Sequence, residues 1–247
     1  MTELREAFEE RSGEVRTYMD FLGQLEVESQ SGSPRFSTST ATISPDQQKL
    51  LYASVYLQLY NLVEATVTLC VQSVVDAACD PQWKPRDFSA VIRREWIRNT
   101  ARTHVDLNYT NRLEAAVELV DHVLAAGPVE DGFEVERGGG GNWDDEQIEK
   151  LSKRLGCKLK VSRAVRRLVK QKVRDDYGPL KLVRSMRNEL AHGQISFTES
   201  ASETTVSDLS QLTDAVLRYL SEVVDHFDRF ISRYEYLEPT SRPGIAA

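Results

Sequence analysis

The stretch that decides the fold is NLVEATVTLCVQSVVDAA, Asn61 to Ala78. It continues a segment that opens with Ser44-Pro45, where serine suits the N-cap of a helix and proline its first position. From Leu50 to Val75, apolar residues occupy nearly all sides of the expected helix. A helix that is apolar all round belongs in the middle of a bundle. The sequence therefore predicts a central helix at about 45–78.

The rest of the chain also follows helical spacing, and we find neither a convincing strand pattern nor an internal repeat. Two further long helices are expected at 2–29 and about 206–236, the second opened by a capping box of Thr205 and Asp208. Shorter helices are expected at 86–103, 111–126, 163–174 and 179–192, and within NWDDEQIEKLSKRLGC (142–157), where Gly156 would end the helix. The predicted fold is all-α, an up-and-down helical bundle with a helical insertion and an extra N-terminal helix.

We divide the chain in sequence order. Residues 1–43 hold the N-terminal helix and a Ser/Thr-rich loop, residues 44–236 form the helical domain, and residues 237–247 are expected to be a flexible tail. Within the domain we distinguish an insertion at about 80–140, a basic segment at 150–174 and a motif helix at 179–192. Glycines 138–141 would make a flexible joint at the end of the insertion.

Composition limits the class of protein. The chain has 247 residues, 40% hydrophobic and 28% charged, enough for a buried core. Three cysteines without metal-ligand spacing fit a reducing cytoplasm, and they suggest no metal and no cofactor. The N-terminus lacks a signal-peptide pattern, and no run of about 18 apolar residues suggests a membrane span. We therefore expect a cytoplasmic protein without a membrane segment.

Charge is distributed unevenly. The net charge is −7, yet residues 150–190 contain fourteen basic and only three acidic residues. Such a block on an acidic body is typical of a polyanion site, although a solvated helix face is the simpler alternative. The candidate RNA-binding residues are Arg163, Arg166, Arg167, Lys170, Lys181 and Arg184.

The basic block leads into VRSMRNELAHGQISF, Val183 to Phe197, which contains Arg187, Asn188 and His192, with Gly193 placed to end the helix. An arginine can stabilise a phosphate, and a histidine can transfer protons near neutral pH. Together they suffice, without a metal, to cleave RNA through its own 2′-hydroxyl. A similar spacing, Arg98 to His104, lies in the insertion without a basic helix before it or a glycine after it.

Helical geometry raises a difficulty. Val183, Met186 and Leu190 form one apolar stripe, whereas Arg187 and His192 point about 140° apart on a straight helix at ~100° per residue. One helix cannot direct both side chains at one phosphate. Either the last turn unwinds at Gly193, or the site combines residues from two chains, which implies a homodimer.

Asn61 and Glu64 are polar residues three positions apart within the apolar stretch. They could hold Arg187 in place, or they could be an ordinary buried pair or an interface contact. Tyr52, Tyr56 and Tyr60 recur every four residues, and we interpret them as core or dimer packing.

Three segments now resemble the HEPN superfamily, and specifically its ribonuclease branch: YNLVEATV (Tyr60–Val67), GGNWDDEQIEKLSKRLG (140–156) and MRNELAHGQISF (Met186–Phe197). Arg187-Asn188-x-x-x-His192 matches the family signature of an arginine, a polar residue and a histidine. The segments are most similar to the bacterial MAE-like subfamily of toxin or defence ribonucleases. The resemblance spans roughly residues 44–236.

The resemblance implies a helical bundle that dimerises through its motif helices and acts as a metal-independent endoribonuclease of toxin–antitoxin or antiphage-defence type. His192 would be the general acid and base, Arg187 the phosphate stabiliser and Asn188 an orienting residue. It also implies RNA, a second copy, and a cognate antitoxin or defence partner protein as partners. Gln194 stands where some relatives carry a tyrosine that a partner enzyme modifies. The alternative is a non-catalytic module that binds RNA, a nucleotide or a protein in a defence complex.

Overall fold

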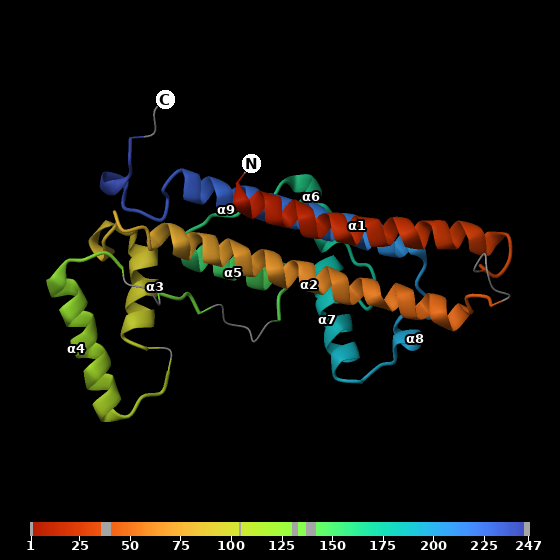
Figure 1. The fold of residues 1–247 in the computed structure, drawn as a ribbon, viewed down its shortest axis with the longest axis horizontal. Helices are drawn as coiled ribbons and strands as arrows, with labels where there is room; N and C mark the ends of the chain where they lie inside the picture. The colour runs from red at the N-terminus through yellow and green to blue at the C-terminus, as the bar shows by residue number, and fades with distance from the viewer. Residues whose placement is uncertain (1, 36–40, 104, 130–132, 137–141, 245–247) are drawn as a thin grey trace. The chain divides into compact units, whose positions relative to one another are not determined.

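The computed structural model describes residues 2–35, 41–103, 105–129, 133–136 and 142–244. Figure 1 shows these residues as helices joined by loops. Strands are missing from the described ranges, which contain three isolated β-bridges. The prediction of an all-α fold is therefore confirmed. The helices are α1 (Glu3–Gln30), α2 (Pro45–Ala78), α3 (Ala90–Thr100), α4 (Tyr109–Ala125), α5 (Asp145–Leu155), α6 (Arg163–Lys170), α7 (Pro179–Ala191), α8 (Phe197–Ser200) and α9 (Val206–Ser232), with short 3-10 turns η1 (Pro85–Asp87) and η3 (Pro239–Ser241).

The long helix α2 begins as the sequence predicts. Ser44 Oγ accepts a hydrogen bond from Gln47 N at 3.2 Å, and Ser44 N donates to Gln47 Oε1 at 2.8 Å. Buried positions then recur from Ala53 to Ala78, with Tyr60 among them, whereas residues 45–52 are exposed or half-buried. Burial of this extent contributes apolar side chains to the core on both sides of Thr66.

The chain forms two compact units that interleave along the sequence. The first comprises residues 1–66, 142–146 and 161–222, and the second comprises residues 67–141, 147–160 and 223–247. The sequence predicts consecutive segments of the chain, whereas each observed unit combines three separate stretches. As a result, α2, α5 and α9 each contribute residues to both units.

In the first unit, α1 runs antiparallel to the start of α2 (Figure 1). Tyr18 Oη donates to Leu51 O at 2.9 Å, and Gln48 Nε2 donates to Ser29 Oγ at 3.1 Å. The other side of α1 contacts α9, where Arg5 Nη1 donates to the Ser221 hydroxyl at 3.0 Å.

The basic helix α6 starts at its predicted N-cap, Ser162, whose hydroxyl accepts from Val165 N at 3.3 Å. It ends at Lys170, so the expected helix over 163–174 is wrong at its C-terminal end. Gln171 is extended, and the chain then turns through Asp175 and Asp176 at φ +51° and +60°. These two left-handed residues cannot continue a right-handed helix.

The motif helix α7 opens at Gly178-Pro179, as predicted. Gly178 packs against the end of α6 so closely that a Cβ there would collide with the carbonyl oxygen of Val169. Glycine is therefore required for the approach of α7 to α6, and Val183, Met186 and Leu190 are buried on the inner face of α7.

The second unit contains α3 and α4, which contact each other. Ser89 caps α3, and the buried carboxylate of Glu95 pairs with Arg98 at 2.8 Å and with Arg154 at 3.4 Å. Of the segment predicted to be a loose tail, residues 237–244 are described: Leu237 is buried, and Glu238 N donates to Asp87 O at 2.8 Å. Gly138–Gly141 and His104 lie outside the described residues.

Candidate functional site

The helix α7 stays regular up to its C-cap, His192. His192 N donates to Asn188 O at 3.0 Å, as in an unbroken α-helix. Gly193, at φ +65°, then ends the helix, with Gly193 N bonded to Leu190 O at 3.2 Å and Gln194 N to Glu189 O at 2.8 Å. This is the Schellman arrangement. The last turn is therefore not unwound before His192, whose exposed imidazole makes no hydrogen bond with any described residue.

Arg187 is held flat on the side of α7, in the first unit. Its guanidinium carbon lies 4.0 Å from the centroid of the Tyr60 ring, a cation–π geometry. Nη1 donates to Asn188 Oδ1 at 2.8 Å, and Nη2 lies 3.6 Å from Glu64 Oε2. The Arg187 side chain keeps 26% of its surface exposed. It is thus fixed in orientation and still reachable from solvent.

Residues Asn142–Asp145, which we term the clasp, tie this arrangement to neighbouring helices of the first unit. Asn188 Nδ2 donates to Asn142 Oδ1 at 2.8 Å, and Trp143 N donates to Tyr60 Oη at 3.3 Å. The four consecutive residues therefore reach two side chains that surround Arg187. Further clasp contacts join Asp144 with Arg184, Asp145 Oδ2 with Lys170 at 2.6 Å, and Asp145 O with Tyr219 Oη at 3.3 Å.

The phenol of Tyr60 is buried beneath Arg187. Burial raises the pKa of Tyr60 above its ordinary value of 10.0, and this exceeds the lowering by the Trp143 N–H and the Arg187 charge. The ring under Arg187 therefore stays neutral at physiological pH. The sequence pattern predicts Tyr60 only as a packing residue and does not predict the clasp. The hydrogen bonds from Asn188 to Asn142 and from Trp143 to Tyr60 join residues far apart in the chain.

A family model described as HEPN_MAE_28990-like HEPN matches residues 1–236. The chain belongs to the HEPN family. The match confirms the resemblance and, because it starts at residue 1, also includes α1. Searches of curated proteins and of solved structures gave no significant match. No helix among the described residues is both long and apolar enough to cross a membrane.

Of the six basic residues predicted to bind RNA in this HEPN chain, Lys170 and Arg184 are ion-paired to the clasp carboxylates. Arg163, Arg166 and Arg167 are exposed on α6 and form no ion pair with a described residue. Lys181 is exposed on α7, with Nζ 4.6 Å from the centroid of the Tyr177 ring. The first unit therefore presents uncompensated positive charge on α6 and α7, which contact each other.

The other candidate site residues do not all lie near Arg187. Glu64 lies beside Arg187, whereas Asn61 is exposed and its side chain bonds to none of the described residues. Arg98, from the similar spacing in the insertion, is bound to Glu95. Within the described ranges, no group of three or more His, Cys, Asp or Glu side chains is placed to hold a metal ion.

Proposed function

We propose that this HEPN protein is a metal-independent endoribonuclease of toxin–antitoxin or antiphage-defence type that acts in the cytoplasm. The observation that carries the proposal is the fixed, partly exposed guanidinium of Arg187 on the helix that ends at the exposed imidazole of His192. A charged planar donor and a proton-transfer group are the two functions that RNA cleavage through the 2′-hydroxyl requires.

In the proposed reaction, the 2′-oxygen attacks the neighbouring phosphorus while the bond from phosphorus to the 5′-oxygen breaks. His192 carries one of the two proton transfers, accepting the 2′-hydroxyl proton or supplying a proton to the leaving 5′-oxygen, and water carries the other. Arg187 stabilises the charge that develops on the phosphate oxygens, and Asn188 orients Arg187 through their 2.8 Å hydrogen bond. The products are a 2′,3′-cyclic phosphate and a 5′-hydroxyl.

The active unit is proposed to be a homodimer in which two α7 helices face each other. Since α7 is regular through His192, its Arg187 and His192 point about 140° apart at ~100° per residue. A two-fold axis would bring Arg187 of one chain toward His192 of the other, because an isologous interface pairs different residues reciprocally.

Arg163, Arg166 and Arg167 on α6, together with Lys181, are proposed to bind the RNA backbone. Lys170 and Arg184 would contribute less, because the clasp carboxylates already compensate their charge. Phosphate contacts release counterions, so RNA affinity should fall steeply with salt. The activity would be held in check by a cognate antitoxin or defence partner protein.

Incubation of purified protein with total RNA in the presence of EDTA tests the proposal. We expect cleavage to 2′,3′-cyclic phosphate ends, its loss in His192→Ala, and its retention in the control His226→Ala, whose ring accepts a hydrogen bond from Lys160 N in the second unit. Cleavage that requires added Mg²⁺, or that survives His192→Ala, would contradict the mechanism. Salt-sensitive RNA binding without product would instead support the non-catalytic alternative.

A further inference from the structure

Helix α4 carries more apolar surface than its neighbours cover. On the side toward α3, Ala115 is buried and Leu119 is half-buried. On another side lie five large apolar residues that are each at least half exposed. Tyr109, at 84%, and Leu124, at 75%, are the most exposed, and the other three are Leu113, Val117 and Val120. We call these five residues the α4 stripe.

The spacing of the α4 stripe is that of a helix-packing face. Its members follow at intervals of four, four, three and four residues, so they line up along one side of the helix. Single exposed apolar residues are ordinary on protein surfaces, but a contiguous patch marks an interaction site. The stripe extends over most of the length of α4 and therefore fits a second helix better than a small molecule.

The charged residues of α4 restrict the charge of a helix that could pack on the α4 stripe. Glu114, Glu118 and Asp121 follow the polar side of α4, exposed and without an ion pair to any described residue. Arg112, at the start of the helix, lies 3.6 Å from Asp106. A second copy of α4 laid along the stripe would add further carboxylates to this acidic side, whereas Lys or Arg residues would complement it.

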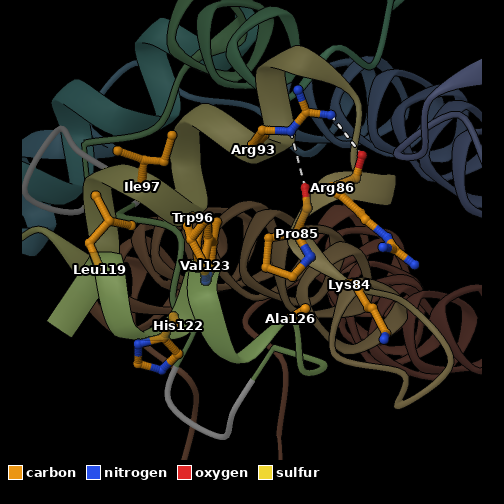
Figure 2. Close-up of a pocket in the computed structure, with 10 residues that line it drawn as sticks. All are labelled: Lys84, Pro85, Arg86, Arg93, Trp96, Ile97, Leu119, His122, Val123 and Ala126. Atoms are coloured by element: carbon orange, nitrogen blue, oxygen red, sulfur yellow. Dashed lines mark hydrogen bonds between the residues drawn. The ribbon is translucent and has the colours of Figure 1, made fainter.

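A groove beside the α4 stripe offers room for an anchoring side chain. It has a volume of about 390 Å³ and lies between η1, α3 and α4. Its lining combines apolar side chains such as Trp96 with the cations of Lys84, Arg86 and Arg93, so an apolar anchor suits it better than a basic one. Figure 2 shows Trp96 of α3 and Val123 of α4 among the residues that line it. Val123, which is 59% exposed, lines the groove and also borders the stripe, so one partner could cover both.

We infer that α4 docks an amphipathic helix of a partner protein. Its apolar face covers the α4 stripe, its Lys or Arg flank faces Glu114, Glu118 and Asp121, and one large apolar side chain enters the groove. This assignment does not rest on the proposed nuclease activity and holds whether or not the chain cleaves RNA.

Synthetic peptides test the inference on the full chain. One peptide is an amphipathic helix of the length of α4 with a leucine stripe and Lys/Arg flanks, and its counterpart carries Glu in place of every Lys and Arg. By fluorescence anisotropy we expect saturable one-to-one binding of the basic peptide, at least about tenfold tighter than of the acidic one and weakened by salt. Leu113→Ser and Val120→Ser should each reduce this affinity about tenfold, and the exposed side chains should leave the circular dichroism unchanged.

Charge reversal sharpens the test. In Glu118→Lys/Asp121→Lys the preference should invert toward the acidic peptide. The matched controls are Glu149→Lys on α5 and Val27→Ser on α1, both exposed, and they should change neither affinity nor preference. Equal binding of the two peptides, or affinity unaffected by Leu113→Ser, would overturn the inference. Self-association that sedimentation detects in the wild type but not in Leu113→Ser would also overturn it, because a second copy would then occupy the stripe.

Discussion

The guanidinium of Arg187 stacks on the ring of Tyr60, with the guanidinium carbon 4.0 Å from the ring centroid. The two residues come from different helices, α7 and α2. Because the ring covers only the face of the guanidinium, the N–H groups at its edge can bind Asn188 and Glu64. A planar cation is needed for this arrangement, because a lysine ammonium can offer neither the stack nor the two-sided donor edge.

Arg187→Lys should therefore lower RNA cleavage about 100-fold or more, although the charge is kept. Single-turnover rates measure the effect, and thermal unfolding checks that the fold is retained. Arg163→Lys, at an exposed position of α6, is the matched control and should stay close to the wild-type rate. An Arg187→Lys protein that cleaves at the wild-type rate would remove Arg187 from the mechanism.

Mixing two inactive variants tests the two-chain site. Arg187→Ala and His192→Ala should each be inactive alone, whereas a mixed dimer holds one intact site that pairs Arg187 of one chain with His192 of the other. Random exchange makes about half of the dimers mixed, so about a quarter of wild-type activity should return. If both residues act within one chain, the mixture will stay inactive.

Asn142→Ala should reduce cleavage because Asn188 loses the clasp contact that orients it beside Arg187. We expect a loss of about tenfold in kcat, with RNA affinity little changed, the order of one hydrogen bond. The double-mutant cycle with Asn188→Ala separates positioning from general damage. Asn142→Ala should have little further effect in the Asn188→Ala background, and full additivity would mean that the clasp does not act through Asn188.

Gly178→Ala should destabilise the protein by about 1–3 kcal/mol, because the added Cβ collides with the Val169 carbonyl between α6 and α7. Gly13→Ala is the opposite case, since its Cβ would meet open space within helix α1. That change should stabilise by up to ~1 kcal/mol. Urea unfolding measures both free energies of unfolding. A Gly178→Ala protein as stable as the wild type would refute the close approach of α6 and α7.

Acid should remove the stabilisation that Asp208 gives to the start of α9. The Thr205 hydroxyl, and then the Thr205 N–H, lower the pKa of Asp208 below its ordinary value of 3.8. The ionised group therefore stabilises the fold above that value, and the effect is lost as pH falls through the lower pKa of the folded state. Asp208→Asn should cost about 0.5–1 kcal/mol at neutral pH and progressively less below pH ~4, as urea unfolding at several pH values would show.

Local signals in the sequence predict where α2, α6 and α9 begin and where α7 ends, whereas the helices expected over 86–103 and 206–236 are longer than α3 and α9. Ser44-Pro45, Ser162, Thr205 with Asp208, and Gly193 each act through residues within one turn, and all behave as predicted. The sequence does not predict the early end of α6, because Gln171, where the backbone becomes extended, is an ordinary helix former.

The candidate site was predictable only in part. The motif identified Arg187 and His192, and the helical angle showed that they diverge. The contacts that fix Arg187, to Tyr60 and through Asn188 to Asn142, join distant parts of the chain. No spacing rule connects such residues, since only the packing of helices brings them together.

The clasp also has an evolutionary consequence. Residues 142–146 return the chain to the first unit between two passages through the second, residues 67–141 and 147–160. We therefore expect relatives to vary more in α4, which is largely exposed, than in α3, whose buried Glu95 pairs with Arg154. Asn142–Asp145 lack this freedom, and we expect them to change only together with Asn188, Arg184 and Lys170, the residues they bind.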